Sequence, residues 1–123
     1  MPSRIVVVHD DLVFADALAE RLAPDVARFA DPVAALTALK SAKNIMFLIT
    51  RLQFNDRQPL GLSLARMARA NRPGVRVIFT GLAEHKDFAR GVGEFLVEPV
   101  LAEHVAVIVE WMEEPDEDYP VDG

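Results

Sequence analysis

A short apolar run between Asn44 and Thr50 constrains the fold more than any other segment. Residues 45–49 are Ile, Met, Phe, Leu and Ile, and polar residues bound them on both sides. A run of this length is typical of a strand buried on both faces, as in the middle of a parallel sheet. In α/β domains with such sheets, the chemistry lies just beyond the carboxyl ends of the strands. We therefore expect Thr50, at the end of this strand, to lie in the functional site.

Length and composition indicate one small domain. The 123 residues leave no room for a second domain, and 51% of them are hydrophobic. The absence of cysteine excludes disulfides, thiolate metal sites and thiol catalysis. The apolar segment after Arg4 is too short for a signal peptide, and no run approaches membrane-spanning length. The sequence therefore predicts a soluble cytoplasmic protein.

The net charge of −6 comes from the end of the chain. Residues 113–123 contain six acidic residues and no basic one, and the rest of the chain is neutral. We predict that this segment is a solvated, disordered tail; the alternative is an acidic docking peptide. No basic stripe or helix-turn-helix pattern is visible, so nucleic acid is not an expected partner.

Five short apolar runs alternate with segments of helical periodicity. The predicted strands are residues 4–8, 26–30, 45–50, 75–80 and 94–97. The predicted helices cover 11–22, 31–40, 60–71, a short segment within 81–90 and a last segment from 101 to 112, with Asp11 and Asp31 as N-caps. The periodicity predicts these inward-facing side chains: Phe14, Leu18, Leu22, Val33, Leu36, Leu39, Leu64, Met67, Ala68, Leu101, Val105, Ile108, Val109 and Met112.

This alternation predicts a (βα)5 doubly wound α/β fold, which is flavodoxin-like. Right-handed crossovers make the five-stranded sheet parallel, with helices on both faces. The common strand order for this number of units is 2-1-3-4-5, which places the switch point between the first and third strands. Those strands end at residues 9–11 (His-Asp-Asp) and at Thr50.

Three segments in this order and spacing carry a family resemblance. They are residues 5–11 (IVVVHDD) followed by an unbroken helix, residues 78–81 (IFTG) and residues 95–100 (FLVEPV). Over residues 4–112 the chain resembles a CheY-like receiver domain, the input module of two-component response regulators. No output domain follows, so the resemblance implies a stand-alone receiver domain within residues 1–112 and an acidic tail at 113–123.

The resemblance implies a phosphorylation pocket with five parts. In the family, an aspartate that ends the third strand accepts a phosphoryl group from a histidine kinase, and two acids after the first strand hold Mg²⁺. A Ser or Thr ends the fourth strand, and a Lys ends the fifth. An aromatic residue on the fifth strand then turns inward. Asp10 matches the second acid, Thr80 the hydroxyl, Phe95 the aromatic residue, and Pro99 a proline usually preceded by a cis bond.

Three positions depart from this pattern. His9 replaces the first acid, Thr50 stands at the phosphoacceptor position, and Glu98 replaces the lysine. A threonine hydroxyl is a poor nucleophile without an adjacent base, although His9 could serve as one. A phosphoryl group on Thr50 would lie near Asp10 and Glu98 with no evident cation. Ordinary aspartyl phosphorylation is therefore not expected.

The pocket acids have alternative roles. Asp10 and Asp11 could bind Mg²⁺ with Glu98, which makes Asp10 a weak candidate metal ligand. The interpretation that we favour makes Asp11 a helix cap and pairs Asp10 with His9 or Arg51. A further hypothesis is an ion pair between Arg51 and Glu98, which would lock the pocket with reversed polarity.

Other residues are weaker candidates. Asp56 could be a substitute acceptor, but loop acids of this kind are usually turn residues. His85 and His104 are expected to be solvated. Thr80 and Phe95 form either a two-state switch or ordinary packing; without a phosphoryl group, only sequence or a bound partner could set such a switch.

We conclude from the sequence that this is a degenerate, non-enzymatic receiver that acts through protein–protein contacts with a kinase, regulator or output protein. The expected surfaces are a short fourth helix, the fifth strand and the last helix, or the loop after the third strand, which looks extended. No cofactor is expected, and dimerisation stays open. One alternative is a small flavodoxin-like enzyme or ligand-binding domain that uses the cleft at the strand ends. Another is a receiver that responds to kinases through Thr50 or Asp56.

Overall fold

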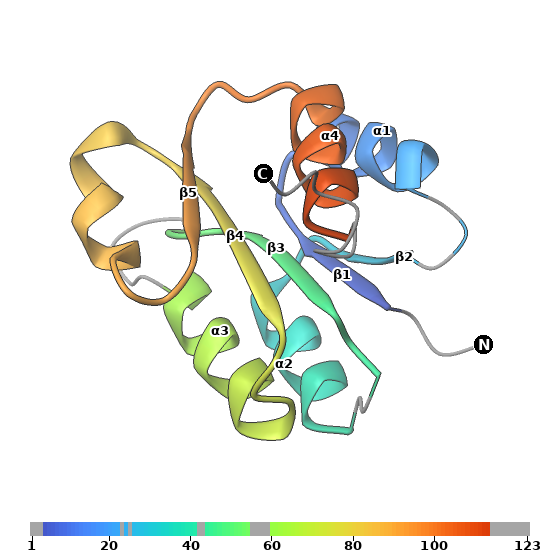
Figure 1. The fold of residues 1–123 in the computed structure, drawn as a ribbon, viewed down its shortest axis with the longest axis vertical. Coiled ribbons are helices and arrows are strands. Elements are labelled where there is room, and N and C mark those ends of the chain that lie inside the picture. The colour runs from blue at the N-terminus through green and yellow to red at the C-terminus, as the bar shows by residue number, and fades with distance from the viewer. Residues whose placement is uncertain (1–3, 23, 25, 42–43, 55–59, 114–123) are drawn as a thin grey trace, which may run out of the picture.

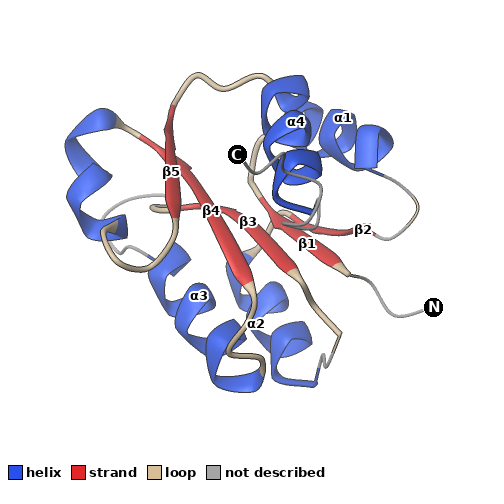
Figure 2. Ribbon diagram, viewed as in Figure 1, coloured by secondary structure: helices blue, strands red, loops and turns tan. Residues whose placement is uncertain are grey.

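The computed structural model describes residues 4–22, 24, 26–41, 44–54 and 60–113. In this part of the chain, a five-stranded sheet carries helices on both faces (Figures 1 and 2). The strands are β1 (Ile5–Val8), β2 (Val26–Phe29), β3 (Phe47–Arg51), β4 (Arg76–Gly81) and β5 (Glu94–Val97). The helices are α1 (Leu12–Leu22), α2 (Pro32–Ser41), α3 (Leu60–Asn71), the 3-10 helix η1 (Ala83–Ala89) and α4 (Ala102–Glu113).

The strand order is β2-β1-β3-β4-β5, and all neighbouring strands are parallel. This confirms the predicted (βα)5 sheet and its order. One core cluster lies between the sheet and α2 and α3, and the other lies between the sheet and α1 and α4. Alternate residues of β1 enter the two clusters, Val6 in the first and Val7 in the second, so both faces of this strand are buried.

Two predicted inward-facing residues point to solvent. Val33 is 65% exposed because α2 begins at Pro32 and buries Ala35 and Leu39, one turn apart, instead. Leu101 is 74% exposed because it precedes the first residue of α4. In both helices the apolar stripe is real, but the sequence placed its first member one turn too early.

The segment after β3 contributes buried apolar side chains that its sequence did not predict. Leu52 is fully buried and Phe54 is 3% exposed, and both join the core cluster under α2 and α3. The rest of the predicted long loop, Asp56 included, lies outside the described residues, as does the acidic tail beyond Glu113. No helix in the described ranges combines the length and the apolar character that crossing a membrane requires.

The start of α3 lies directly against the end of β3. The Gly61 N–H donates to the Leu52 carbonyl at 2.9 Å. A Cβ atom on Gly61 would lie 2.1 Å from the Arg51 carbonyl oxygen. This distance is far shorter than a van der Waals contact, so the backbone would have to shift. This contact therefore requires glycine, and it fixes the backbone that presents Arg51.

Candidate functional site: an arginine at the strand ends

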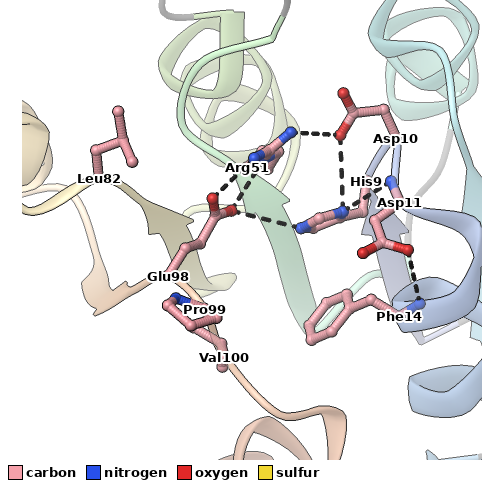
Figure 3. Close-up of a pocket in the computed structure, with 9 residues that line it drawn as sticks. All are labelled: His9, Asp10, Asp11, Phe14, Arg51, Leu82, Glu98, Pro99 and Val100. Carbon is pink, nitrogen blue, oxygen red and sulfur yellow. Dashed lines mark hydrogen bonds and ion pairs between the residues drawn. The ribbon is translucent and has the colours of Figure 1, made fainter.

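Polar side chains from four strand ends meet at one edge of the sheet. They surround a cleft of about 510 Å³ (Figure 3). The lining residues come from the end of β1, from β3, from the segments after β4 and β5, and from α1: His9, Asp10, Asp11, Phe14, Arg51, Leu82, Glu98, Pro99 and Val100. The site therefore lies where the predicted switch point placed it.

Arg51 is the centre of this site (Figure 3). Its guanidinium makes a two-pronged ion pair with Glu98, in which Nε lies 2.9 Å from Oε2 and Nη2 lies 2.8 Å from Oε1. The remaining nitrogen, Nη1, lies 2.8 Å from Oδ1 of Asp10. Such bidentate, charge-assisted hydrogen bonds are among the stronger polar contacts in proteins. The hypothesised Arg51–Glu98 ion pair is therefore present, and Asp10 has the arginine partner that we favoured.

Glu98 is held from a further side by Thr80. The Thr80 hydroxyl donates to Oε2 of Glu98 at 2.9 Å. The hydrogen bond from Arg51 lowers the pKa of Glu98, and the Thr80 hydrogen bond adds to this effect. In return, the Glu98 carboxylate raises the pKa of Arg51. The cluster is therefore an ionised carboxylate bound to an arginine that stays charged.

His9 is buried and acts as an acceptor. The Asp11 backbone N–H donates to Nδ1 of His9 at 3.1 Å, which leaves the proton of a neutral imidazole on Nε2. Nε2 lies 3.6 Å from Oε2 of Glu98, and the ring centroid lies 4.6 Å from that of Phe14. Burial lowers the pKa of His9, and the nearby Arg51 charge lowers it further.

Asp11 caps α1. Its Oδ1 accepts hydrogen bonds from the backbone N–H groups of Val13 and Phe14, at 3.1 and 3.2 Å. The two neighbouring aspartates thus have different partners: Asp11 satisfies the helix N-terminus, and Asp10 satisfies the arginine.

Thr50 is fully buried, and its hydroxyl donates to the Arg51 carbonyl at 2.9 Å. It does not belong to the residues that line the cleft in the described structure. The expectation that this site has no evident cation is wrong. The residue next to Thr50 brings the guanidinium there, because its backbone pairs in register with Thr80 on β4.

The remaining sequence candidates are dispersed. The Glu98–Pro99 peptide bond is cis, as predicted. Phe95 is partly buried against the core cluster under α2 and α3, so close to Gly81 that a Cβ there would lie 3.2 Å from its ring. His104 is exposed, but the expectation for His85 is wrong in part, because its side chain is only 20% exposed.

Sequence reasoning missed several residues of the site. Phe14 was assigned to the core, and the tilted contact of its ring with that of His9 depends on the direction of α1, which periodicity does not fix. Leu82 and Val100 line the cleft from segments without helical or strand periodicity. Gln53 lines an adjacent cleft of about 530 Å³ together with Glu84 and His85. The only available signal was that each follows the end of a predicted strand.

The acids of the cleft are already engaged with a cation. Asp10 and Glu98 both bind Arg51, and the described residues contain no group of three or more His, Asp or Glu side chains that could hold a metal ion. A metal would therefore have to displace the guanidinium before it could use these oxygens.

Comparison with known proteins identifies the fold. No protein-family model matches the chain, and no curated protein sequence matches it. Among solved structures, it is similar to a response regulator receiver protein from Sinorhizobium medicae WSM419, with a TM-score of 0.74, 20% identity and coverage of 90% of this chain and 94% of that chain. A CheY-like response regulator receiver domain protein from Methanospirillum hungatei JF-1 gives a TM-score of 0.73, 18% identity and coverage of 91% and 94%.

A structure described as an adenylate cyclase, from Rhodopirellula baltica, is also similar, with a TM-score of 0.74, 17% identity and coverage of 90% and 87%. At these identities the similarity concerns the backbone. The chain therefore has the fold of response regulator receiver domains, with an arginine-centred ion-pair cluster where the ends of its strands meet.

Proposed function

We propose that this protein is an atypical, stand-alone receiver of two-component signal transduction that acts in the cytoplasm by binding another protein, without being phosphorylated or catalysing a reaction. The observation that carries the proposal is the Arg51 cluster, because it fills the position that a phosphorylation pocket would need. The fold supports the receiver assignment, and the cluster supports the atypical mode.

Arg51 competes with Mg²⁺ for the same oxygens. A magnesium ion needs near-octahedral oxygen ligands, and Asp10 and Glu98 are the acids nearest the guanidinium. Breaking three charge-assisted hydrogen bonds, each of which contributes about 1.5–3 kcal/mol, opposes this exchange. We therefore propose that the pocket works without a metal and without any other cofactor.

Thr50, at the position of the phosphoacceptor, is also poorly suited to accept a phosphoryl group. Thr50 is buried, and its hydroxyl is already used as a donor to a backbone carbonyl. A transferred phosphoryl group requires positive charge, and the guanidinium next to Thr50 is already bound to the carboxylates of Glu98 and Asp10. Phosphorylation of Thr50 would thus oppose both the local hydrogen bonding and the local charge.

Exposed apolar side chains are present on the surfaces expected to contact a partner. Phe88 of η1 is 54% exposed, Val97 of β5 is 47% exposed, and Trp111 of α4 is 60% exposed. Aromatic residues at an interface provide much of its binding energy. We propose that a kinase, regulator or output protein binds here and that the state of Phe95 is set by this partner, not by a phosphoryl group.

Magnesium titration followed by amide NMR, with beryllofluoride added at the end, tests the proposal. For the wild-type chain we expect no saturable shift at the amides of Asp10, Thr50 and Thr80. Intact-mass analysis after incubation with a phosphoramidate donor should show no added phosphoryl group. Saturable shifts that extend to Phe95, or a mass increase of one phosphoryl group, would contradict the proposal.

Arg51→Ala is the matched variant, because it frees both carboxylates. Its Asp10 and Glu98 amides should respond to Mg²⁺, whereas those of the wild type should not. If neither chain responds, the guanidinium is not what excludes the metal, and the role assigned to Arg51 is wrong. A response in both chains contradicts the metal-free pocket itself.

A further inference from the structure

The outer edge of β5 carries backbone groups that point away from the sheet. β5 is an edge strand, so only one of its sides pairs with a neighbouring strand, β4. Directly after β5, the Glu98 N–H donates to the Gly81 carbonyl of β4 at 2.8 Å, so residue 98 faces β4. Successive residues of a strand direct their N–H and C=O groups to opposite sides. The backbone groups of Phe95 and Val97 therefore face outward.

These outward groups have no hydrogen-bond partner in the described part of the chain. No hydrogen bond there uses the N–H or the C=O of Phe95 or Val97. The open stretch is bounded on both sides, because the Gly93 N–H donates to the Ala89 carbonyl of η1 at 3.1 Å and Pro99 has no N–H. The edge thus offers donors and acceptors at the spacing that an extended segment beside β5 requires.

The opposite edge of the sheet, β2, is protected by charge, and β5 is not. The His9 N–H donates to the Phe29 carbonyl at 2.9 Å, so the residue of β2 that faces outward before it is Arg28. The Arg28 side chain forms an ion pair with Asp16. Charged side chains on an edge strand are one means by which natural sheets avoid pairing with other chains. The outward residues of β5 are apolar instead, and Val97 is 47% exposed.

The two sides of β5 differ in character. β5 lies between η1 and α4 (Figure 1). Phe95 packs with Ala89 of η1 in the core cluster under α2 and α3, whereas Leu96 packs against the cluster under α1 and α4. By alternation, Val97 lies on the side of Phe95, and Glu94 lies on the side of Leu96. Glu94 is exposed and takes part in no ion pair within the described residues. An added strand would therefore meet apolar side chains on one side and a carboxylate on the other.

A second copy of this chain fits the edge poorly. Two β5 strands related by a twofold axis would run antiparallel, and pairing of the outward groups would place Phe95 opposite Val97 of the second copy. In the same register, Glu94 would lie opposite Glu98 of the second copy. Like charges directly opposite each other destabilise a strand pair. Charge complementarity therefore favours a segment of a different protein, with a basic residue opposite Glu94.

We propose that a partner protein adds an extended segment to the edge of β5, with apolar residues at the centre of the segment and a basic residue that faces Glu94. The backbone of the segment pairs with Phe95 and Val97, and its alternate apolar side chains lie beside the side chains of these two residues. This contact rests on the function proposed above, because it names the kind of segment through which the partner binds.

Amide NMR with a synthetic peptide tests the proposal on the full wild-type chain. The probe is Lys-Val-Ile-Val-Lys, blocked at both ends, whose two lysines place a cation opposite Glu94 in either strand direction. We expect saturable downfield shifts of the Phe95 and Val97 amide protons and smaller shifts at Leu96, whose N–H faces β4. Shifts at Leu96 as large as those at its neighbours, or no saturable shift, would overturn the proposal.

A second peptide separates backbone pairing from side-chain contacts. It has the same side chains, but its three central residues are N-methylated and so cannot donate to β5. We expect it to bind at least about tenfold more weakly, because hydrogen bonds are lost and carbonyls of the edge stay unpaired. Equal binding of the two peptides would mean that side chains alone carry the contact, and strand addition would be wrong.

Glu94→Gln should weaken binding of the lysine peptide several-fold, because it removes the charge that faces the lysine. Glu20→Gln is the matched control, since it removes the same charge from the exposed face of α1 and should leave binding unchanged. Equal weakening in both variants would contradict the role of Glu94. Val97→Pro keeps the β4–β5 ladder, because the Val97 N–H faces away from β4, and it should abolish the shift at Phe95.

The contact and the function proposed above can fail separately. The peptide titration contains neither Mg²⁺ nor a phosphoryl donor. If the chain takes up a phosphoryl group, the proposed function is wrong; if it does not and the peptide also fails to bind, only the strand addition is wrong. Shifts at Phe95 and Val97 that appear when the protein concentration is raised without peptide would mean that a second copy occupies the edge, and they would overturn the proposal.

Discussion

The arrangement of Glu98 depends on a single neighbouring residue. Arg51 follows Thr50 and places its guanidinium between Glu98 and Asp10. The sequence allowed the Arg51–Glu98 pair as a hypothesis, because both residues follow strands that end at the same edge. It did not reveal that one guanidinium binds both acids at once, because this depends on the rotamer of Arg51 and on the β3–β4 register.

At the same scale, His9 should make stability depend on pH. Burial keeps the pKa of His9 in the folded state below the unfolded value of 6.5. Between these two pKa values, the unfolded state therefore binds a proton that the folded state does not bind. Stability is therefore complete above pH 6.5 and falls as the pH decreases toward the folded pKa, by about 1.4 kcal/mol for each unit of difference.

Urea unfolding between pH 7.5 and 5 measures this slope. The wild-type midpoint should decrease with acid, and the decrease should be smaller in His9→Asn, whose side-chain oxygen can still accept from the Asp11 N–H. If both chains show the same slope, His9 is not the group responsible.

Individual helices and strands show where sequence patterns predict structure reliably. The bounds of α3 and β5 agree with the prediction to the residue. In the sequence, a proline stands on each side of α3, and β5 lies between a glycine and a proline, so the ends of both elements are marked. The first inward residues of α2 and α4 were wrong, since periodicity fixes the spacing of a stripe and not the residue at which it starts. The burial of Leu52 and Phe54 required the structure, because two apolar residues in a polar loop are ordinary surface residues elsewhere.

The junction of β3 and α3 gives a prediction at the scale of elements. Gly61→Ala places a Cβ against the Arg51 and Leu52 backbone, where neither partner is a flexible side chain. We expect a loss of about 1–3 kcal/mol in the free energy of unfolding, together with shifts in the Arg51 and Glu98 resonances.

Gly74→Ala is the matched control, because nothing lies within 4 Å of its added Cβ. It should change the free energy of unfolding by no more than about 0.5 kcal/mol. Equal effects of the two substitutions would mean that the contact at Gly61 does not constrain α3.

For the whole molecule, the alternation of strands and helices was sufficient to predict the fold. Parallel crossovers have one hand, so few strand orders are available to a chain of this length. The pattern carries no information about segments without periodicity, and these segments contribute Leu82 and Val100 to the cleft. The layers of the fold were therefore accessible from the sequence, and much of the rim of the site was not.

The sheet should open from its edges. All residues of β1 are buried, and so are most of β3 and β4, whereas β2 has no buried residue and β5 is half exposed. Native-state hydrogen exchange should be at least about tenfold slower in the three central strands, which corresponds to about 1.4 kcal/mol in opening free energy. Exchange in β5 as slow as that in β3 would contradict this order and would indicate that another chain covers the edge.

The Arg51 cluster differs from a metal site in one thermodynamic respect. A metal ion dissociates and rebinds, and its occupancy is set by its affinity and by the ion concentration of the solution. A guanidinium attached to β3 cannot diffuse away, and its local concentration is fixed by a side-chain tether. The charge between Asp10 and Glu98 is therefore constant when the ionic composition around the protein changes, and a chelator has nothing to remove from it.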